Sequence, residues 1–128
     1  MHNPPMIPRR GLFLVVAAAA ALIGCGGTTD DRPAKWSFIS ATITEPSCAT
    51  VNCHSEIAKR AGVDMHDRAT GFDVMVNKGF ADPAAPDDSP VIKLMNGQGA
   101  RRMPPDMPLP DADILLIRNW IAAGATNN

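Results

Sequence analysis

The sequence has 128 residues, and its 12 lysines and arginines nearly balance 13 aspartates and glutamates, giving a formal net charge of −1. Because the charges are mixed and form no basic stripe, the composition gives no support to nucleic-acid binding. The length is enough for one small domain once the first segment of the chain is set aside.

Residues 1–24 have the three-part organisation of an export signal. A basic start at Arg9 and Arg10 precedes an apolar run from Gly11 to Ile23, and small residues follow. This run is shorter than the roughly 20 apolar residues that a bilayer span needs. We therefore expect residues 1–24 to be a cleaved signal peptide with no part in the fold.

The signal segment runs into the sequence Leu22-Ile23-Gly24-Cys25. It resembles the lipobox of bacterial lipoproteins, in which the cysteine is diacylated and the bond before it is cleaved. The resemblance implies lipidation of Cys25 and a place in the cell envelope, on the inner or outer membrane, with the domain in the periplasm or at the cell surface. Each buried CH₂ of an acyl chain adds about 0.8 kcal/mol of membrane affinity. A secretory signal with a chance cysteine is the alternative.

The expected mature chain begins with residues 25–34, which are polar and turn-forming and indicate a lipidated flexible tether. The domain then covers 35–128. Its first element is expected to be a helix over 36–45, although its β-branched residues keep a strand possible. Within this segment, helical spacing relates Phe38, Ile39, Thr42 and Ile43. Pro46 is expected to end the helix and to leave a loop as far as Cys53.

The middle of the domain is expected to contain short helical pieces and a loop. In chain order we expect a helical turn, a helix, a loop and a short helix, over 55–61, 67–78, 81–88 and 90–95. Gly71 weakens the prediction for the second of these segments. Ser89 and Pro90 are typical of an N-cap followed by proline at the first helical position, which favours the last one.

Residues 96–110 contain two glycines and four prolines without apolar periodicity, which predicts an extended loop of the kind that is usually functional. The closing helix should begin at Asp111 and stop at Gly124. Its apolar stripe consists of Ile114, Ile117, Trp120 and Ile121. No strand pair is evident, so the fold class is all-α with short helices and long loops. Five aromatic side chains leave a modest core that a large apolar cofactor would complete.

The residues with the clearest chemistry form the sequence Cys48-Ala-Thr-Val-Asn-Cys53-His54. A thiol can add across a haem vinyl group to give a thioether, and a histidine directly after the second thiol is held near the iron. The usual attachment sequence has two residues between its cysteines. This one has four, which makes the motif less specific.

The segment 36–126 resembles c-type cytochromes, and in particular small cytochrome c-like lipoprotein domains of bacteria. Three features carry the resemblance: the Cys-x₄-Cys-His loop after a first helix, the late-loop sequence Arg102-Met103-Pro104-Pro105, and the closing helix that ends near Gly124. It implies a small cytochrome c-like fold around one covalent haem c, with thioethers at Cys48 and Cys53, His54 as proximal ligand and Met103 as distal ligand. The implied activity is one-electron transfer with redox partner proteins rather than catalysis.

Several residues have a second interpretation. Met107 also precedes a proline and is a rival distal ligand, whereas Met65 and Met95 are expected to pack. His66 is expected to be exposed at a helix start. Arg101 and Arg102 can pair with haem propionates or form a solvated basic corner.

Two alternatives to haem binding follow from the same residues. Cys48 and Cys53 can form a disulfide in an oxidising compartment, in a lipoprotein module that binds a partner and holds no haem. A zinc or copper site made from Cys48, Cys53, His54 and His66 requires free thiols and ranks last.

Overall fold

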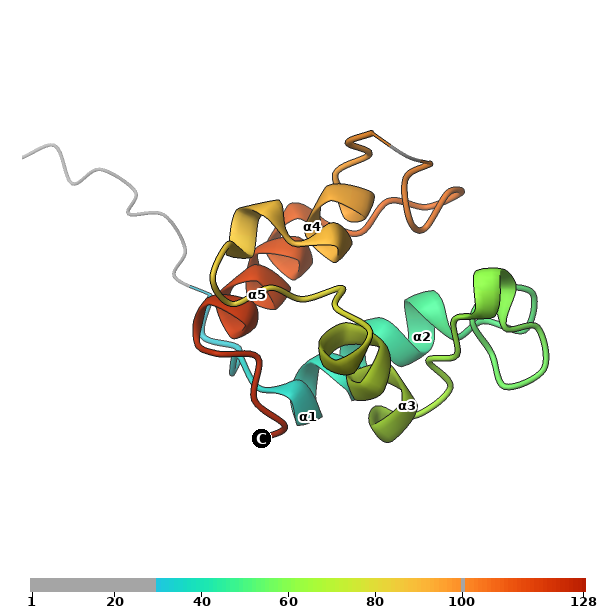
Figure 1. Cartoon of the computed structure of the whole chain (residues 1–128), viewed down its shortest axis with the longest axis horizontal. Helices are drawn as coiled ribbons and strands as arrows, with labels where there is room; N and C mark the ends of the chain where they lie inside the picture. The colour runs from blue at the N-terminus through green and yellow to red at the C-terminus, as the bar shows by residue number, and fades with distance from the viewer. Residues whose placement is uncertain (1–29, 100) are drawn as a thin grey trace, which may run out of the picture.

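The computed structural model describes residues 30–99 and 101–128. These residues form helices, turns and loops and contain no strand (Figure 1), which confirms the all-α prediction. The predicted signal peptide and the lipobox cysteine Cys25 lie outside the described residues. No helix in the described part of the chain combines the length and apolarity that a membrane span needs.

The first helical segment is longer than predicted. It runs without a break through α1 (Trp36–Ile39), the π-helical η1 (Ser40–Thr44) and α2 (Glu45–Cys48). The expectation that Pro46 ends this helix is therefore wrong. In the π turn the Glu45 N–H donates to the Ser40 carbonyl five residues back, and this wider turn relieves the clash between a proline ring and the preceding turn. As a result Cys48 is the last residue of a helix.

The segment after Cys48 consists mostly of turns. The helical turn predicted over 55–61 is present in part, as one turn in which the Lys59 N–H donates to the Ser55 carbonyl at 3.1 Å. The one short helix of this segment is the 3₁₀ turn η2 (Arg60–Gly62), where Ala61 has a positive φ of 55°. The next predicted helix is present as α3 (Arg68–Phe72) continued by the π-helical η3 (Asp73–Asn77). Asp67 begins it with a capping box to Thr70, which stabilises the helix start.

The predicted helices in the second half of the domain are present. The 3₁₀ turn η4 (Pro86–Asp88) leads into α4 (Pro90–Met95), and the closing helix is α5 (Asp111–Ala122). Ser89 occupies the N-cap position of α4, but its side chain makes no cap hydrogen bond to that helix. Its hydroxyl instead accepts the Asp82 N–H at 2.9 Å, so this buried serine closes the loop that precedes α4.

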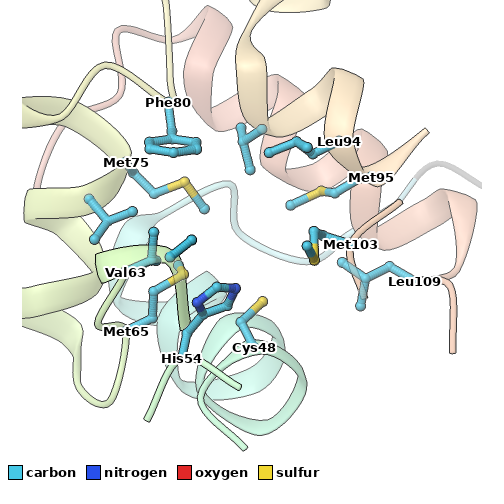
Figure 2. Close-up of a pocket in the computed structure, with 13 residues that line it drawn as sticks. Cys48, His54, Val63, Met65, Met75, Phe80, Leu94, Met95, Met103 and Leu109 are labelled. Atoms are coloured by element: carbon cyan, nitrogen blue, oxygen red, sulfur yellow. The ribbon is translucent and has the colours of Figure 1, made fainter. Parts of the chain in front are cut away.

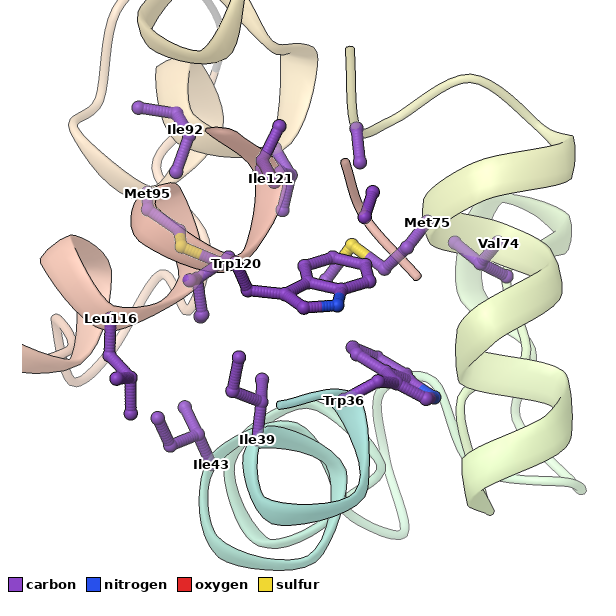
Figure 3. Close-up of a cluster of buried hydrophobic side chains, with 14 of the residues drawn as sticks. Trp36, Ile39, Ile43, Val74, Met75, Ile92, Met95, Leu116, Trp120 and Ile121 are labelled. Carbon is purple, nitrogen blue, oxygen red and sulfur yellow. The ribbon is translucent and has the colours of Figure 1, made fainter. Parts of the chain in front are cut away.

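The core forms where α5 packs on α1 (Figure 3). The rings of Trp36 and Trp120 lie with their centroids 4.9 Å apart, and Phe72 meets both rings edge-on. Both indole N–H groups are satisfied, by the carbonyls of Arg68 and Thr126. Burying these indoles with their polar atoms paired gives the small domain a rigid centre.

Gly71 explains how α3 approaches this centre. A Cβ at this position would lie 3.0 Å from Cζ2 of Trp36. The glycine that weakened the helix prediction is therefore a close-packing position, where the cost in helix propensity is accepted for contact with a buried indole.

Candidate functional site

An apolar cavity lies between the first half of the domain, which contains α1, α2 and α3, and the second half, which contains α4 and the loop after it. Figure 2 shows the side chains that point into this cavity. Its volume is about 280 Å³, just below the roughly 300–1,000 Å³ typical of small-molecule pockets. The lining is almost wholly apolar, and four of its residues are methionines: Met65, Met75, Met95 and Met103. The lining also contains one thiol, Cys48, and one imidazole, His54.

His54 is held by three hydrogen bonds. Its backbone N–H donates to the Cys48 carbonyl at 3.0 Å, and its own carbonyl accepts the Met65 N–H at 2.8 Å. Its ring nitrogen Nδ1 lies 3.1 Å from the Arg60 carbonyl. Because a carbonyl can only accept, this contact assigns the proton to Nδ1 and leaves the lone pair on Nε2. Such a backbone contact is the usual support of a metal-ligating histidine.

The two cysteines are free thiols in the structure. Cys48 lines the cavity at the end of α2, while Cys53 lines an adjoining hollow of about 110 Å³. Burial, together with the neighbouring Cys53, raises the pKa of Cys48 to about 11. At neutral pH Cys48 is therefore a protonated thiol, which is a poor metal ligand and a slow partner in disulfide exchange.

The structure separates the two candidate methionines of the late loop. Met103 lines the cavity together with His54, and its backbone N–H donates to the Leu94 carbonyl at 3.0 Å. Met107 is 77% exposed and lies along a different groove, beside Cys53. Only the first of these two therefore shares a cavity with the histidine.

The other cavity methionines come from a loop, from α4 and from η3. Met65 and Met95 are buried, as expected, and both also line the cavity. Met75, on η3, was not singled out from the sequence, because a methionine within an apolar run looks like any packing residue. The cavity is richer in thioether sulfur than the sequence motifs alone indicated.

His66 does not line the cavity. It is half-buried, and its Nδ1 lies 2.7 Å from Asp64 Oδ1. A hydrogen bond to Asp64 raises the pKa of His66, and the charges of Asp64, Asp67 and Glu56 act in the same direction against burial. Over residues 30–99 and 101–128, no three His, Cys, Asp or Glu side chains gather to hold a metal ion. The zinc or copper site proposed from Cys48, Cys53, His54 and His66 is therefore not assembled.

The adjoining hollow introduces positive charge at one end of the cavity. Arg60 and Arg101 line it together with Cys53, His54 and the Met103 segment. Arg102 is not among its lining residues, and its side chain lies over Gly97 instead. Arg60 was missed from the sequence, where nothing links it to a loop forty residues later.

The site thus offers one imidazole nitrogen, several thioether sulfurs and two thiols around an apolar space with a cationic end. Comparisons with protein-family models, curated proteins and solved structures found no match to this chain. The chemistry of the site therefore rests on its own residues.

Proposed function

We propose that the chain is a c-type cytochrome-like domain that binds one covalent haem c and carries one electron at a time between redox partner proteins. One observation supports this most strongly. His54 and Met103 are 49 positions apart in the sequence, yet both line one apolar cavity with Cys48 in its wall. A nitrogen and a thioether sulfur are the axial pair of electron-transfer haem proteins.

The residues present fit this group. His54 would offer Nε2 to the iron, because Nδ1 is engaged by the Arg60 carbonyl. Met103 would offer its sulfur, and Cys48 and Cys53 would supply the thioether attachment. Iron in the bound group supplies reversible one-electron chemistry, and a methionine ligand raises its reduction potential. The apolar walls exclude water. Arg60 and Arg101, which line the adjoining hollow, provide positive charge that can pair with the haem carboxylates.

A carrier of this kind needs no substrate pocket beside the haem, so we propose an electron carrier rather than an enzyme. His54 and Met103 together would leave the bound iron no free position for a substrate. We further propose that the carrier is held in the cell envelope through lipid on Cys25.

Visible absorption of the purified full chain tests the proposal. We expect a haem spectrum that stays with the polypeptide after acid and acetone extraction, because thioether bonds survive this treatment. A chain with both Cys48→Ala and Cys53→Ala should lose the colour on extraction. Ser47→Ala, a small change directly beside Cys48, is the matched control and should keep it.

Two results would contradict the proposal. A colourless protein from cells with an active haem-attachment system would refute haem binding, and unchanged covalent haem in the double cysteine variant would refute attachment through Cys48 and Cys53. A colourless protein whose two thiols resist alkylation would instead favour the disulfide-stabilised interaction module.

A further inference from the structure

The loop over residues 59–66 has an unusual backbone. Lys59, Ala61 and Gly62 have positive φ values of 38°, 55° and 72°. Two of these are not glycines, and non-glycine residues avoid this region unless surrounding contacts hold them there. Contacts with the rest of the domain must therefore hold this loop in place.

The loop is bound to the segment that carries the candidate ligand. The Arg60 N–H donates to the Cys53 carbonyl at 3.0 Å, and the Met65 N–H donates to the His54 carbonyl at 2.8 Å. Between these two bonds, the Arg60 carbonyl faces Nδ1 of His54 at 3.1 Å. The position of one loop carbonyl thus decides which ring nitrogen of His54 carries the proton.

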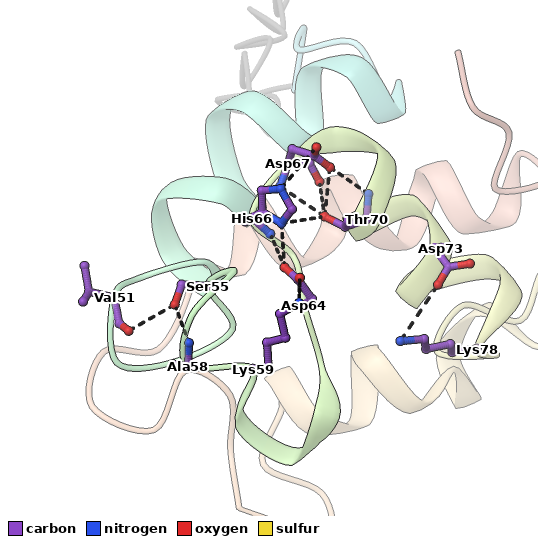
Figure 4. Close-up of polar contacts among 10 residues, drawn as sticks. All are labelled: Val51, Ser55, Ala58, Lys59, Asp64, His66, Asp67, Thr70, Asp73 and Lys78. Carbon is purple, nitrogen blue, oxygen red and sulfur yellow. Dashed lines mark hydrogen bonds and ion pairs between the residues drawn. The ribbon is translucent and has the colours of Figure 1, made fainter.

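Asp64 connects the two ends of this loop, as Figure 4 shows. One of its carboxylate oxygens lies 3.0 Å from Nζ of Lys59. The other accepts the His66 backbone N–H at 3.1 Å and faces His66 Nδ1 at 2.7 Å. The Asp64 side chain is 15% exposed, compared with 51% for Lys59, so the carboxylate is the fixed member of the pair.

The connection continues into α3. His66 Nε2 lies 3.4 Å from Asp67 Oδ2, and Asp67 is the residue that caps α3 through Thr70. Asp64 therefore ties the loop to the start of a packed helix. A network of this form can keep a strained loop in one conformation.

From these contacts we infer that Asp64 is a positioning residue, which holds the Arg60 carbonyl against Nδ1 of His54 and thereby directs Nε2 into the cavity. The effect of Asp64 on an iron centre rests on the proposed function, whereas its effect on the His54 ring does not. An acceptor on Nδ1–H fixes the ring and raises the basicity of the ligand. Loss of that acceptor should therefore leave the ring looser and raise the reduction potential.

The test is the exchange of the His54 Nδ1 proton with water, followed by nitrogen-15 NMR on the full chain as purified. The test variant is Asp64→Asn, which keeps the shape but removes the charge that binds Lys59. Asp73→Asn is the matched control, because Asp73 pairs with Lys78 at 3.9 Å on η3, away from the loop. We expect exchange to become several-fold faster in Asp64→Asn and to stay unchanged in Asp73→Asn.

Lys59→Gln provides a second variant in case Asp64→Asn does not fold. It removes the exposed half of the contact, leaves Asp64 bound to His66, and should speed the exchange in the same direction. In haem-bound protein the reduction potential should rise in Asp64→Asn and Lys59→Gln and stay unchanged in the control. Equal exchange rates in all four proteins would overturn the inference.

The two hypotheses fail in different ways. A colourless chain in which Asp64→Asn still exposes the Nδ1 proton would refute haem binding and retain the positioning role. A haem-bound chain whose exchange rate and potential do not respond to Asp64 would retain haem binding and refute the positioning role.

Discussion

His54 and Met103 reach the cavity from supports of different stiffness. The histidine is bonded at its backbone N–H, its carbonyl and its ring. The methionine belongs to a long loop, and a backbone bond to the Leu94 carbonyl places it beside α4. A proposed axial pair of this kind combines one fixed ligand with one on a loop. The loop ligand is the one whose identity most needs testing.

We predict that Met103, and not Met107, is the distal ligand. Methionine sulfur on ferric haem gives a weak charge-transfer band in the far red and raises the potential. Met103→Ala should abolish that band and lower the potential. Met107→Ala changes a side chain that is 77% exposed and should preserve both. The opposite pattern would transfer the ligand role to Met107.

His66 should make stability depend on pH. Its pKa is raised above 6.5, first by the hydrogen bond to Asp64. A group with a raised folded-state pKa contributes stability that is fully present below its unfolded pKa and is lost as pH rises through the folded value. Denaturant unfolding should therefore show wild type losing stability from pH 6.5 upward relative to His66→Gln. A difference between the two proteins that is independent of pH would contradict this.

At the scale of elements, the closing helix should be the main source of stability. Trp120 on α5 is 1% exposed and stacks on Trp36 of α1. Truncation of a buried tryptophan costs about 3–5 kcal/mol, a large share of the roughly 5–15 kcal/mol of a folded domain. Trp120→Ala should lower the unfolding midpoint strongly, whereas Leu115→Ala on the same helix, at a 51% exposed site, should change it little. Similar midpoints for both variants would show that α5 does not close the core.

The elements that the sequence predicted best were those with local signals. Ser89-Pro90 and the apolar stripe of α5 correctly predicted two helices. A proline at the first turn and a 3.6-residue apolar period are both signals contained within a few residues of the helix itself. Pro46 was misread, since the π turn that accommodates it has no sequence signature. The hydroxyl of Ser89 was assigned to a cap, whereas tertiary structure directs it to the Asp82 loop.

The residues of the candidate site could be predicted only where a short stretch of sequence identifies them. Cys48, Cys53 and His54 form a motif, and Met103 stands out through its flanking residues. Arg60 and Met75 could not be found, because their roles depend on how a turn and a π helix pack around the cavity. The role inferred for Asp64 depends on backbone geometry that no local pattern encodes.

At the scale of the whole molecule, the cavity lies where two halves of the chain meet. His54 and Met65 belong to the first half, with α1, α2 and α3, whereas Met95 and Met103 belong to the second, with α4 and its following loop (Figure 2). The halves are joined on the other side by the Trp36–Trp120 contact. A group bound between His54 and Met103 would therefore add a connection between the two parts of the chain on the side away from the tryptophan pair.

The domain begins close to the predicted lipid anchor. Arg32 binds both Asp30 and Asp113 of α5, so the chain is already against the domain seven residues after Cys25. Those seven residues can span at most about 25 Å in any conformation. Asp113 also lines the groove beside Cys53, which places that groove on the side of the attachment. A lipid on Cys25 would therefore hold this side of the domain close to the membrane surface.

We predict that Cys25→Ala abolishes both acylation and lipoprotein-type cleavage. Without the thiol no acyl chain can be attached, and cleavage of the bond before residue 25 should stop as well. Mass spectrometry should show acyl chains and the cleaved N-terminus on wild type and on Cys48→Ala, and neither of them on Cys25→Ala. Acyl chains on Cys25→Ala would refute the lipobox assignment, and an unacylated wild type that is released as free protein would favour a simple secretory signal.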